Sequence, residues 1–360
     1  MLDLWRNDLY QKELDNASLP EEVWEKLYGK KILITGATGM VCSFLVDLLR
    51  KKNRSLSDGR RMELVLPVRD IAYAKKRFPE CNGCGRIVWV ESDAAGFGEK
   101  LAGTFFHFAI AGAGNADPKQ FAEHPAETME GNLLGVTELL KLAKGKRDVR
   151  LVYLSTGEVY GNAGFREAAF REEDSYYVNS MEARACYPNG KRAAETFCAA
   201  YHKEYGVDVT VGRLCYIYGP TAKESDSRSV AQFLGKAAKG EDILLKSSGE
   251  QVRSYCYVAD AAAALLYLMV FGIGGEAYNI ADSGSNCSIA EFAGLAAAAA
   301  GTGIVRTAAG EREKAGFSKV VRAVQDPGKI NAIGWKAGVS LEDGIKRTIE
   351  ILRSENERTG

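Results

Sequence analysis

The chain has no excess of charge of either sign and no long hydrophobic run. Its 360 residues include 47 basic and 47 acidic side chains, so the formal net charge is zero. Nucleic-acid binders usually carry a basic excess and membrane-surface proteins a polybasic cluster, so both classes are disfavoured. Charged residues interrupt the N-terminal segment, and Asp260 interrupts the apolar stretch 258–273. Neither a signal peptide nor a membrane span is predicted, and we expect a soluble cytoplasmic protein without nucleic-acid or membrane partners.

Histidine is scarce, and the cysteines are not arranged as a metal site. The chain has three histidines and eight cysteines. Without an export signal, the cysteines are expected to stay reduced. Cys81 and Cys84 have the spacing of a zinc or redox pair, but the histidines are not spaced to complete a zinc site. Asn82-Gly83 between them is typical of a surface turn, so we assign no metal there and keep metal or redox chemistry only as a minor alternative.

Strand-like and helix-like segments alternate over the first 220 residues. Helical patterns at 72–78, 127–144 and 187–205 lie between apolar runs of the kind found in buried parallel strands. This alternation predicts an α/β fold with a doubly wound parallel sheet, the Rossmann arrangement, covered by helices on both faces. The predicted strands are 31–35, 62–68, 87–90, 104–110, 149–155 and 208–214.

A glycine-rich turn joins the first predicted strand to the helix that follows. Gly36 permits a tight turn, and Gly39 lets backbone N–H groups approach a pyrophosphate at the positive end of the helix. Thr38 and Met40 belong to the same turn, and Cys42 replaces the usual third glycine. Because a strand precedes this motif and a helix follows it, the context indicates a dinucleotide-binding site.

The residues that would select the cofactor include one that favours NADP and one that favours NAD. After the second predicted strand, Arg69 would suit the 2′-phosphate of NADP, whereas Asp70 would suit the ribose hydroxyl of NAD. Asp93, after the third strand, is a candidate contact to the adenine edge. Ala109, in the fourth strand, is a further candidate for cofactor binding.

The organisation changes after residue 218. Residues 1–28 form a charged, helical extension whose role the sequence does not indicate. Residues 29–218 are expected to form the dinucleotide-binding domain, with return segments near 252–282. Residues 219–360 are expected to form mainly a smaller α/β cap that binds substrate. Its predicted strands are 243–245, 254–258 and 277–280, and its predicted helices are 229–239, 259–271, 288–300 and 341–353.

Tyr187 and Lys191 stand four residues apart at the start of a predicted helix, which places them on one helical face. An ammonium near a phenol favours the phenolate, so Lys191 is expected to lower the pKa of Tyr187 towards neutrality. Such a tyrosine can remove a hydroxyl proton while hydride leaves the same carbon for a nicotinamide. Thr156, at the end of the fifth predicted strand, can hold the substrate oxygen during this transfer.

Four motifs occur in the order found in the extended short-chain dehydrogenase/reductases, namely TGATGMVC, LSTGEVYG, YPNGK and RLCYIYGP. Over about residues 30–352 the chain resembles the nucleotide-sugar epimerases, dehydratases and decarboxylases of that family. The resemblance implies that Thr156, Tyr187 and Lys191 are catalytic and that NAD is the cofactor.

The same resemblance implies contacts to substrate and to a second subunit. Asn132 matches an asparagine that helps to order the active site, and Arg253 matches an arginine that contacts the phosphates or sugar of the substrate. Tyr216 stands where relatives have an asparagine that contacts the nucleotide diphosphate. A homodimer built from two helices of each subunit is also implied, with 127–144 and 187–205 as the matching stretches.

Glu158 narrows the expected reaction. By the resemblance, it takes the position of a carboxylate that sugar 4,6-dehydratases and uronic-acid decarboxylases place beside the sugar. The dehydratases pair it with an aspartate where this chain has Gly157, which counts against dehydration. The sequence from Arg184 to Arg192 is most similar to the UDP-glucuronate decarboxylases. We therefore expect oxidation of a nucleotide sugar at C4 followed by decarboxylation at C5, with 4-epimerisation and 4,6-dehydration as alternatives.

Two other classes stay open, an NADPH-dependent carbonyl reductase, which Arg69 favours, and a non-catalytic dinucleotide-binding protein. The expected reaction reduces and reoxidises its cofactor in one cycle. Because a retained cofactor suits such a cycle better than an exchanged one, NAD is preferred and NADP remains open.

Overall fold

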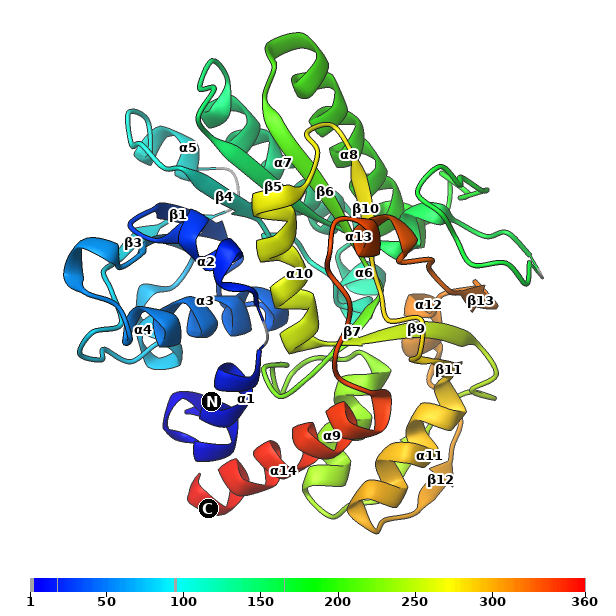
Figure 1. Ribbon diagram of the computed structural model, residues 1–360. Coiled ribbons are helices and arrows are strands. Elements are labelled where there is room, and N and C mark those ends of the chain that lie inside the picture. The colour runs from blue at the N-terminus through cyan, green and yellow to red at the C-terminus, as the bar shows by residue number, and fades with distance from the viewer. Residues whose placement is uncertain (1–2, 18, 94–95, 165, 360) are drawn as a thin grey trace.

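A parallel sheet forms the centre of the molecule (Figure 1). The computed structural model describes residues 3–17, 19–93, 96–164 and 166–359. Within them the sheet has seven strands in the order β10-β6-β5-β4-β1-β2-β3. The order reverses between β1 and β4, where doubly wound folds bind their ligands, so the predicted fold class is confirmed. The strands are β1 (Lys31–Thr35), β2 (Glu63–Val68), β3 (Ile87–Glu91), β4 (Phe108–Ala111), β5 (Arg150–Thr156), β6 (Asp208–Leu214) and β10 (Ala277–Ile280).

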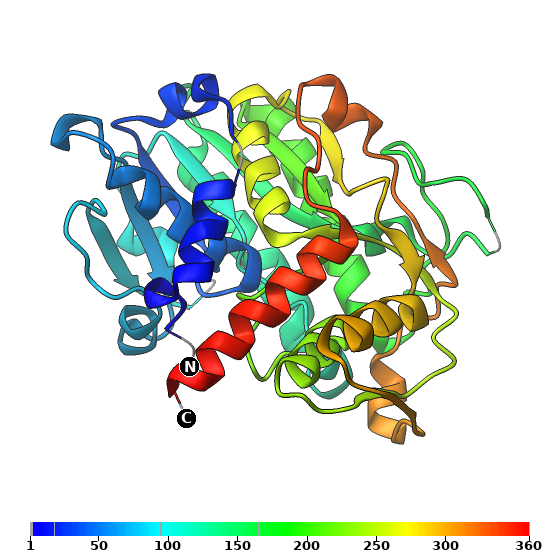
Figure 2. The same ribbon diagram turned by 60° about the horizontal axis from the view of Figure 1, so that its bottom comes forward.

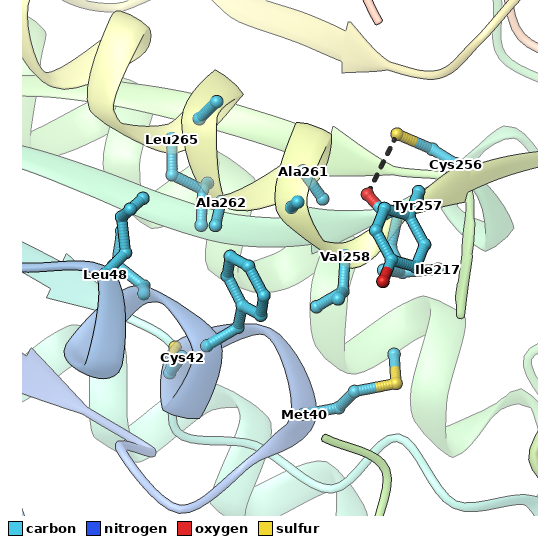
Figure 3. Close-up of a cluster of buried hydrophobic side chains, with 14 of the residues drawn as sticks. Met40, Cys42, Leu48, Ile217, Cys256, Tyr257, Val258, Ala261, Ala262 and Leu265 are labelled. Atoms are coloured by element: carbon cyan, nitrogen blue, oxygen red, sulfur yellow. Dashed lines mark hydrogen bonds between the residues drawn. The ribbon is translucent and has the colours of Figure 1, made fainter. Parts of the chain in front are cut away.

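Helices cover both faces of this sheet. Alternate residues of a strand point to opposite faces, so Ile32 and Ile34 of β1 join one core and Leu33 joins the other. The first core includes α3 (Met40–Asn53) and α10 (Val258–Phe271), and the second includes α7 (Pro125–Ala143) and α8 (Cys186–Tyr205). Figure 3 shows α3 against α10, with Cys42 and Leu48 below Ala261, Ala262 and Leu265.

The C-terminal part of the chain forms smaller sheets beside the main one. β9 (Val252–Tyr257) pairs with β7 (Tyr216–Tyr218), β11 (Asn286–Ser288) and β13 (Arg322–Ala323), and β8 (Ile243–Leu245) pairs with β12 (Ile304–Arg306). Three helices pack together over them, namely α9 (Ser229–Ala238), α11 (Ile289–Ala300) and α14 (Leu341–Thr359). Shorter helices are α4 (Ile71–Arg77), α5 (Phe97–Lys100), α6 (Pro118–Glu123), α12 (Glu311–Gly316) and α13 (Gly328–Ala332).

The N-terminal extension is a packed part of the fold. It contains a 3₁₀ turn (Leu4–Arg6), α1 (Asp8–Asn16) and α2 (Glu21–Leu27). α1 contacts both α3 and α14, so the two ends of the chain lie close together (Figure 2). The Asn7 side chain accepts hydrogen bonds from the N–H groups of Leu9 and Tyr10 and thereby caps α1. The buried Tyr10 hydroxyl donates to Asp47 of α3 at 3.0 Å.

The start of the fourth strand and the state of two cysteines differ from expectation. The fourth strand begins at Phe108 rather than at residue 104. Cys81 and Cys84 form a disulfide, so the prediction of reduced thiols is wrong for this pair, whereas the other described cysteines are free. Over the residues that the structure describes, no helix is long and apolar enough to span a membrane.

Candidate active site

The glycine-rich turn lies at the point where the strand order reverses. Gly36 has φ of +68°, and a Cβ atom there would lie 2.4 Å from the carbonyl oxygen of Gly112, which follows β4. Gly39 caps α3, and its N–H donates to the Gly36 carbonyl at 2.8 Å. The turn therefore leaves the backbone bare at the N-terminus of α3, a cradle that fits the pyrophosphate of a dinucleotide.

The side chains beside this turn connect it to the region after β7. Thr38 is half-buried in the turn, and Met40 is the first residue of α3. The Met40 carbonyl accepts a hydrogen bond from the Thr221 hydroxyl at 2.8 Å, and its sulfur lies 3.7 Å from Nη2 of Arg228. The N-terminus of α3 is thus tied directly to the segment that leads into the cap.

The proposed selectivity residues lie at the same edge of the sheet. Arg69 and Asp70 are exposed after β2, and Asp70 accepts from the Tyr73 N–H at 2.8 Å as the N-cap of α4. Asp93 is exposed after β3 and accepts from the Gly96 N–H at 2.7 Å. Ala109 differs, because it lies inside β4 with its side chain fully buried in the core. Ala109 is therefore not on the edge where a cofactor would contact it.

Tyr187 and Thr156 meet where β5 ends and α8 begins. The Thr156 side chain lies close enough to the Tyr187 hydroxyl to lower its pKa, and its Oγ1 accepts from the Glu158 N–H at 3.3 Å. The ring of Phe121 from α6 stacks on Tyr187, with centroids 4.5 Å apart and planes within 15°. The predicted hydroxyl pair is brought together and held by an aromatic residue.

Lys191 lies one turn further along α8 and is buried. Its ammonium donates to the Leu154 carbonyl of β5 at 2.7 Å. Asn132 of α7 donates to the carbonyls of Thr128 and Asn115 at 2.7 and 3.0 Å. A Cβ atom on Gly114 would lie 2.4 Å from Oδ1 of Asn132 and 3.5 Å from Nζ of Lys191. Both predicted polar side chains therefore converge beside Gly114.

Burial controls the proton affinities of these groups. Burial and, after it, the nearby Glu158 carboxylate raise the pKa of Tyr187 to about 12, and Thr156 opposes the rise. Burial also lowers the pKa of Lys191 to about 8. The expectation that Lys191 brings the tyrosine towards neutrality is thus wrong for this structure, because desolvation dominates and the ammonium hydrogen-bonds with Leu154.

Glu158 forms an ion pair at the start of the 3₁₀ turn Gly157–Tyr160. Its two carboxylate oxygens accept from Nη2 of Arg184 at 3.1 and 3.0 Å. The adjacent Gly157 has no room for a side chain, because a Cβ atom would lie 2.6 Å from Oε1 of Gln325. The buried Gln325 amide is fixed by its hydrogen bonds to the Arg213 carbonyl and to Asn279, at 3.0 and 2.8 Å.

Arg253 is a buried cation at the junction of β9 and β13. Its side chain is 2% exposed, and it donates to the carbonyls of Val252, Val320 and Val321. Nε of Arg253 is buried without a hydrogen-bond partner among the described residues. Its Cζ lies 5.3 Å from the ring centre of Tyr216. A guanidinium held only by neutral carbonyls retains its full charge for an anionic ligand.

Three site residues were not found from the sequence, namely Phe121, Arg228 and Gln325. Arg228 lies near Tyr187 and opposes the rise of its pKa, while its Nε donates to Asp226 at 2.9 Å. All three come from segments distant in the sequence from Tyr187. No local pattern marks them, because their roles arise from the packing of α6 and of the cap against the start of α8 and the turn after β5.

Known proteins are similar to this chain in sequence and in fold. A model of the NAD dependent epimerase/dehydratase family matches residues 32–281. UDP-glucuronic acid decarboxylase 1 of Xenopus tropicalis is 32% identical over 341 residues, which cover 91% of this chain and 73% of that protein. UDP-glucuronic acid decarboxylase 6 of Arabidopsis thaliana is 30% identical over 244 residues, 66% of each chain.

Solved structures agree in fold at lower identity. UDP-glucuronic acid 4-epimerase from Bacillus cereus, in complex with UDP-glucuronic acid and NAD, has a TM-score of 0.72 at 19% identity and covers 90% of this chain and 99% of that chain. UDP-glucose 4-epimerase from Thermotoga maritima has a TM-score of 0.74 at 23% identity and covers 90% and 98%. The family match spans most of the main sheet and the glycine-rich turn, and this chain therefore belongs to the NAD dependent epimerase/dehydratase family.

Proposed function

We propose that this protein oxidises a nucleotide sugar at C4 with NAD and then decarboxylates it at C5, with UDP-glucuronate as substrate. The observation that carries this proposal is the Glu158–Arg184 ion pair next to Tyr187 and Thr156. It places a carboxylate and a guanidinium beside the group that would act at C4. Relatives at about 30% identity are UDP-glucuronic acid decarboxylases, which supports the same choice.

The residues at the sheet edge fit the proposed cofactor. Gly36 and Gly39 would receive the pyrophosphate at the N-terminus of α3, with Thr38 and Met40 beside it, and Asp70 and Asp93 would bind the adenosine half. When bound, NAD supplies a hydride acceptor for C4 of the sugar and can return that hydride later. Lys191, which lies against the end of β5, would orient the nicotinamide half.

Tyr187 is the proposed base for the first step. As a phenolate, Tyr187 would take the proton of the C4 hydroxyl, and Thr156 would hold the same oxygen through its own hydroxyl. Since the pKa of Tyr187 is raised to about 12, the phenolate needs added positive charge beside it. Arg228 and Arg184 are the cations of this chain that oppose the rise. Asn132 serves as a positioning residue for Lys191.

The second step follows from the chemistry of the oxidised sugar. A ketone at C4 is β to the carboxyl carbon on C5, so the bonding electrons can move towards the ketone as carbon dioxide leaves. A proton must then return to C5. We assign that proton transfer to Glu158, with Arg184 holding its carboxylate in place.

The space around Gly157 favours decarboxylation over dehydration. A 4,6-dehydratase needs an acid beside the glutamate to protonate the leaving hydroxyl. Here Gln325 fills that space, and its amide is fixed by hydrogen bonds to Asn279 and Arg213. An aspartate at this position could not be accommodated without moving a buried amide.

Arg253 is proposed to bind the diphosphate of the substrate. It is buried, and its Nε has no partner among the described residues, so an anion would complete its hydrogen bonds. Tyr216 lies against the same guanidinium. This arrangement supplies a flat aromatic face and a fixed charge at one end of the site, which suits a nucleoside diphosphate.

One observation favours NADP. Burial lowers the pKa of Lys223, in the segment after β7, and the positive charge of Arg69 at the end of β2 lowers it further. A 2′-phosphate would relieve their repulsion. Equilibrium binding of NAD and NADP to the same protein, followed by Arg69→Gln, separates the two cofactors, because only NADP affinity depends on a cation there.

A homodimer is also proposed. α7 and α8 pack side by side, and they expose Met129, Leu134 and Phe197 at 40%, 42% and 39%. Large apolar side chains exposed along paired helices favour burial in a subunit interface. The family resemblance points to the same two helices.

The test is incubation with a panel of UDP-, dTDP-, CDP- and GDP-sugars that includes UDP-glucuronate, read by mass spectrometry. Loss of carbon dioxide from UDP-glucuronate is expected, whereas loss of water or an unchanged mass with a changed sugar would indicate dehydration or epimerisation. Tyr187→Phe is the matched control and should abolish turnover. Stoichiometric consumption of NADPH without these products would instead identify a carbonyl reductase.

A further inference from the structure

The loop that contains Cys81 and Cys84 lies away from the residues proposed for catalysis. It connects α4 to β3 and carries a disulfide with Cα atoms 5.6 Å apart. Cys81 is half-buried and Cys84 is buried, while Asn82 between them is exposed. Cys81 is therefore the more accessible residue of the pair.

Two side chains of α3, three residues apart, hold this loop. Arg50 donates from Nη2 to the Pro79 carbonyl, and the same nitrogen lies 3.7 Å from the sulfur of Cys81. Asn53 donates to the Cys84 carbonyl at 3.0 Å. A Cβ atom on Gly85 would lie 2.2 Å from Nδ2 of Asn53, so the glycine permits this close approach. Both ends of the loop are therefore fixed to one helix.

A buried cation lies beside the sulfur of Cys81. Arg50 is buried, with Cζ 4.3 Å from the ring centre of Trp5. Asp47 balances only part of the charge, because it pairs with both Arg50 at 3.2 Å and Arg77 at 2.7 Å. Positive charge beside a cysteine stabilises its thiolate, which is the nucleophile in thiol–disulfide exchange.

A metal does not explain this pair. Among the described residues, no group of three or more histidine, cysteine or acidic side chains comes together in a way that could hold a metal ion. Two sulfurs alone do not make a structural zinc site, which takes four ligands.

We propose that Cys81 and Cys84 form a reversible dithiol–disulfide exchange site in which Cys81 is the attacking sulfur. In the oxidising direction, the Cys81 thiolate attacks a low-molecular-weight disulfide, forms a mixed disulfide and releases one thiolate. Cys84 then loses its proton and attacks the Cys81 sulfur, which releases the second small thiol. The two protein thiols are oxidised, and the small disulfide is reduced to two thiols.

The first test is a redox titration of the full-length protein in buffers of reduced and oxidised glutathione. Cysteines are trapped by alkylation and each peptide is read by mass spectrometry. We expect the Cys81–Cys84 peptide to convert in one two-electron transition, while the half-buried Cys287 stays alkylated throughout. A pair that never reduces, a pair that never oxidises, or oxidation of Cys287 over the same range would overturn the proposal.

The second test separates the two sulfurs. Reduced Cys84→Ser should accumulate a mixed disulfide with glutathione at residue 81, whereas reduced Cys81→Ser should not form one at residue 84. Equal trapping in both variants would contradict the assigned roles.

A third measurement tests the contribution of Arg50. In the reduced wild-type protein, alkylation of Cys81 should titrate below the ordinary thiol pKa of about 8.5. Arg50→Lys keeps the positive charge and should leave alkylation of Cys81 close to the wild-type rate. Arg50→Met should slow alkylation of Cys81 at neutral pH about tenfold. The wild-type titration stands even if the methionine variant does not fold. A midpoint at or above the ordinary value would contradict the assigned role of Arg50.

Discussion

Arg184 joins Glu158 to the cap. Its Nη2 donates to both Glu158 oxygens at 3.1 and 3.0 Å, while its Nε donates to the Gly316 carbonyl at 3.0 Å. Its Cζ also lies 4.8 Å from the ring centre of Phe121, which stacks on Tyr187. One guanidinium therefore links the carboxylate, the aromatic support of the tyrosine and the short helix α12. The position of the Glu158 carboxylate therefore depends on how the cap packs against the main sheet.

Glu158→Gln is expected to retain oxidation at C4 and to block the step at C5. The amide cannot handle the C5 proton, but removal of the negative charge should lower the raised pKa of Tyr187 and leave the first step intact. Mass spectrometry of the 4-keto sugar, together with absorbance of the reduced cofactor, measures both steps. The exposed Glu182→Gln is the control. If both steps fall equally, Glu158 has a structural or binding role.

Gly157→Ala should destabilise the protein by about 1–3 kcal/mol, because the new Cβ overpacks against Gln325. Urea unfolding measures this loss. The double variant with Gln325→Ala should recover part of it, since the cavity left by the amide accepts the methyl group. Gly235→Ala in α9 is the control, because a Cβ atom there meets nothing within 4 Å. Additive losses in the double variant would show that the two positions do not compete for space.

Lys191→Met should abolish turnover and change how stability depends on pH. With the lysine pKa lowered from 10.5 to about 8, the unfolded chain binds more protons than the folded one between these values, so wild-type stability rises with pH there. The buried ammonium thus costs about 3 kcal/mol below this window and nothing above it. Denaturation at pH of about 7 and 11 should show the advantage of the variant over wild type shrinking by that amount. A difference that is constant with pH would contradict the shifted pKa.

Arg253→Lys should raise KM for the nucleotide sugar about ten- to a hundredfold, equivalent to about 1.4–2.8 kcal/mol, with a smaller effect on kcat. The lysine keeps the charge but loses the planar fork that two phosphate oxygens can share. Calorimetry with UDP alone reports the same loss without turnover. The exposed Arg306→Lys is the matched control. Unchanged UDP affinity would remove Arg253 from the binding site.

Phe197→Glu should convert the proposed dimer into monomers, because a charge replaces an apolar side chain that is 39% exposed on α8. Light scattering coupled to size exclusion measures the mass. Ile273→Glu, which changes an apolar residue that is 62% exposed outside α7 and α8, should leave the mass unchanged. A wild-type protein that is monomeric at high concentration would contradict the proposed interface.

Most of the fold follows from patterns that are local in the sequence. The runs 31–35 and 208–214 coincide with β1 and β6, and the helices of the main sheet end within two residues of their expected limits. The predicted fourth strand began too early. The Thr104 N–H donates to Leu101 in the preceding turn, and the backbone first bonds to β1 and β5 at His107, directly before β4 begins at Phe108. α14 runs to Thr359, beyond the expected end at residue 353, where amphipathic spacing weakens.

The candidate site was only partly visible in the sequence. Tyr187 and Lys191 are found because helical spacing alone puts them on one face. The proton affinity of Tyr187 could not be predicted, because it depends on burial by α6 and on Glu158. Gln325 could not be found either, since its position over Gly157 depends on β13 pairing with β9.

The contact of α1 with α14 should make the two ends of the chain one cooperative unit. Glu355 of α14 accepts hydrogen bonds from the Asp3 N–H at 2.8 Å and from the Asn7 amide at 3.5 Å. Fraying of either end exposes the buried partner groups of the other, so the two should lose protection against hydrogen exchange together. Cleavage near one end would then loosen the other, although they are more than three hundred residues apart along the chain.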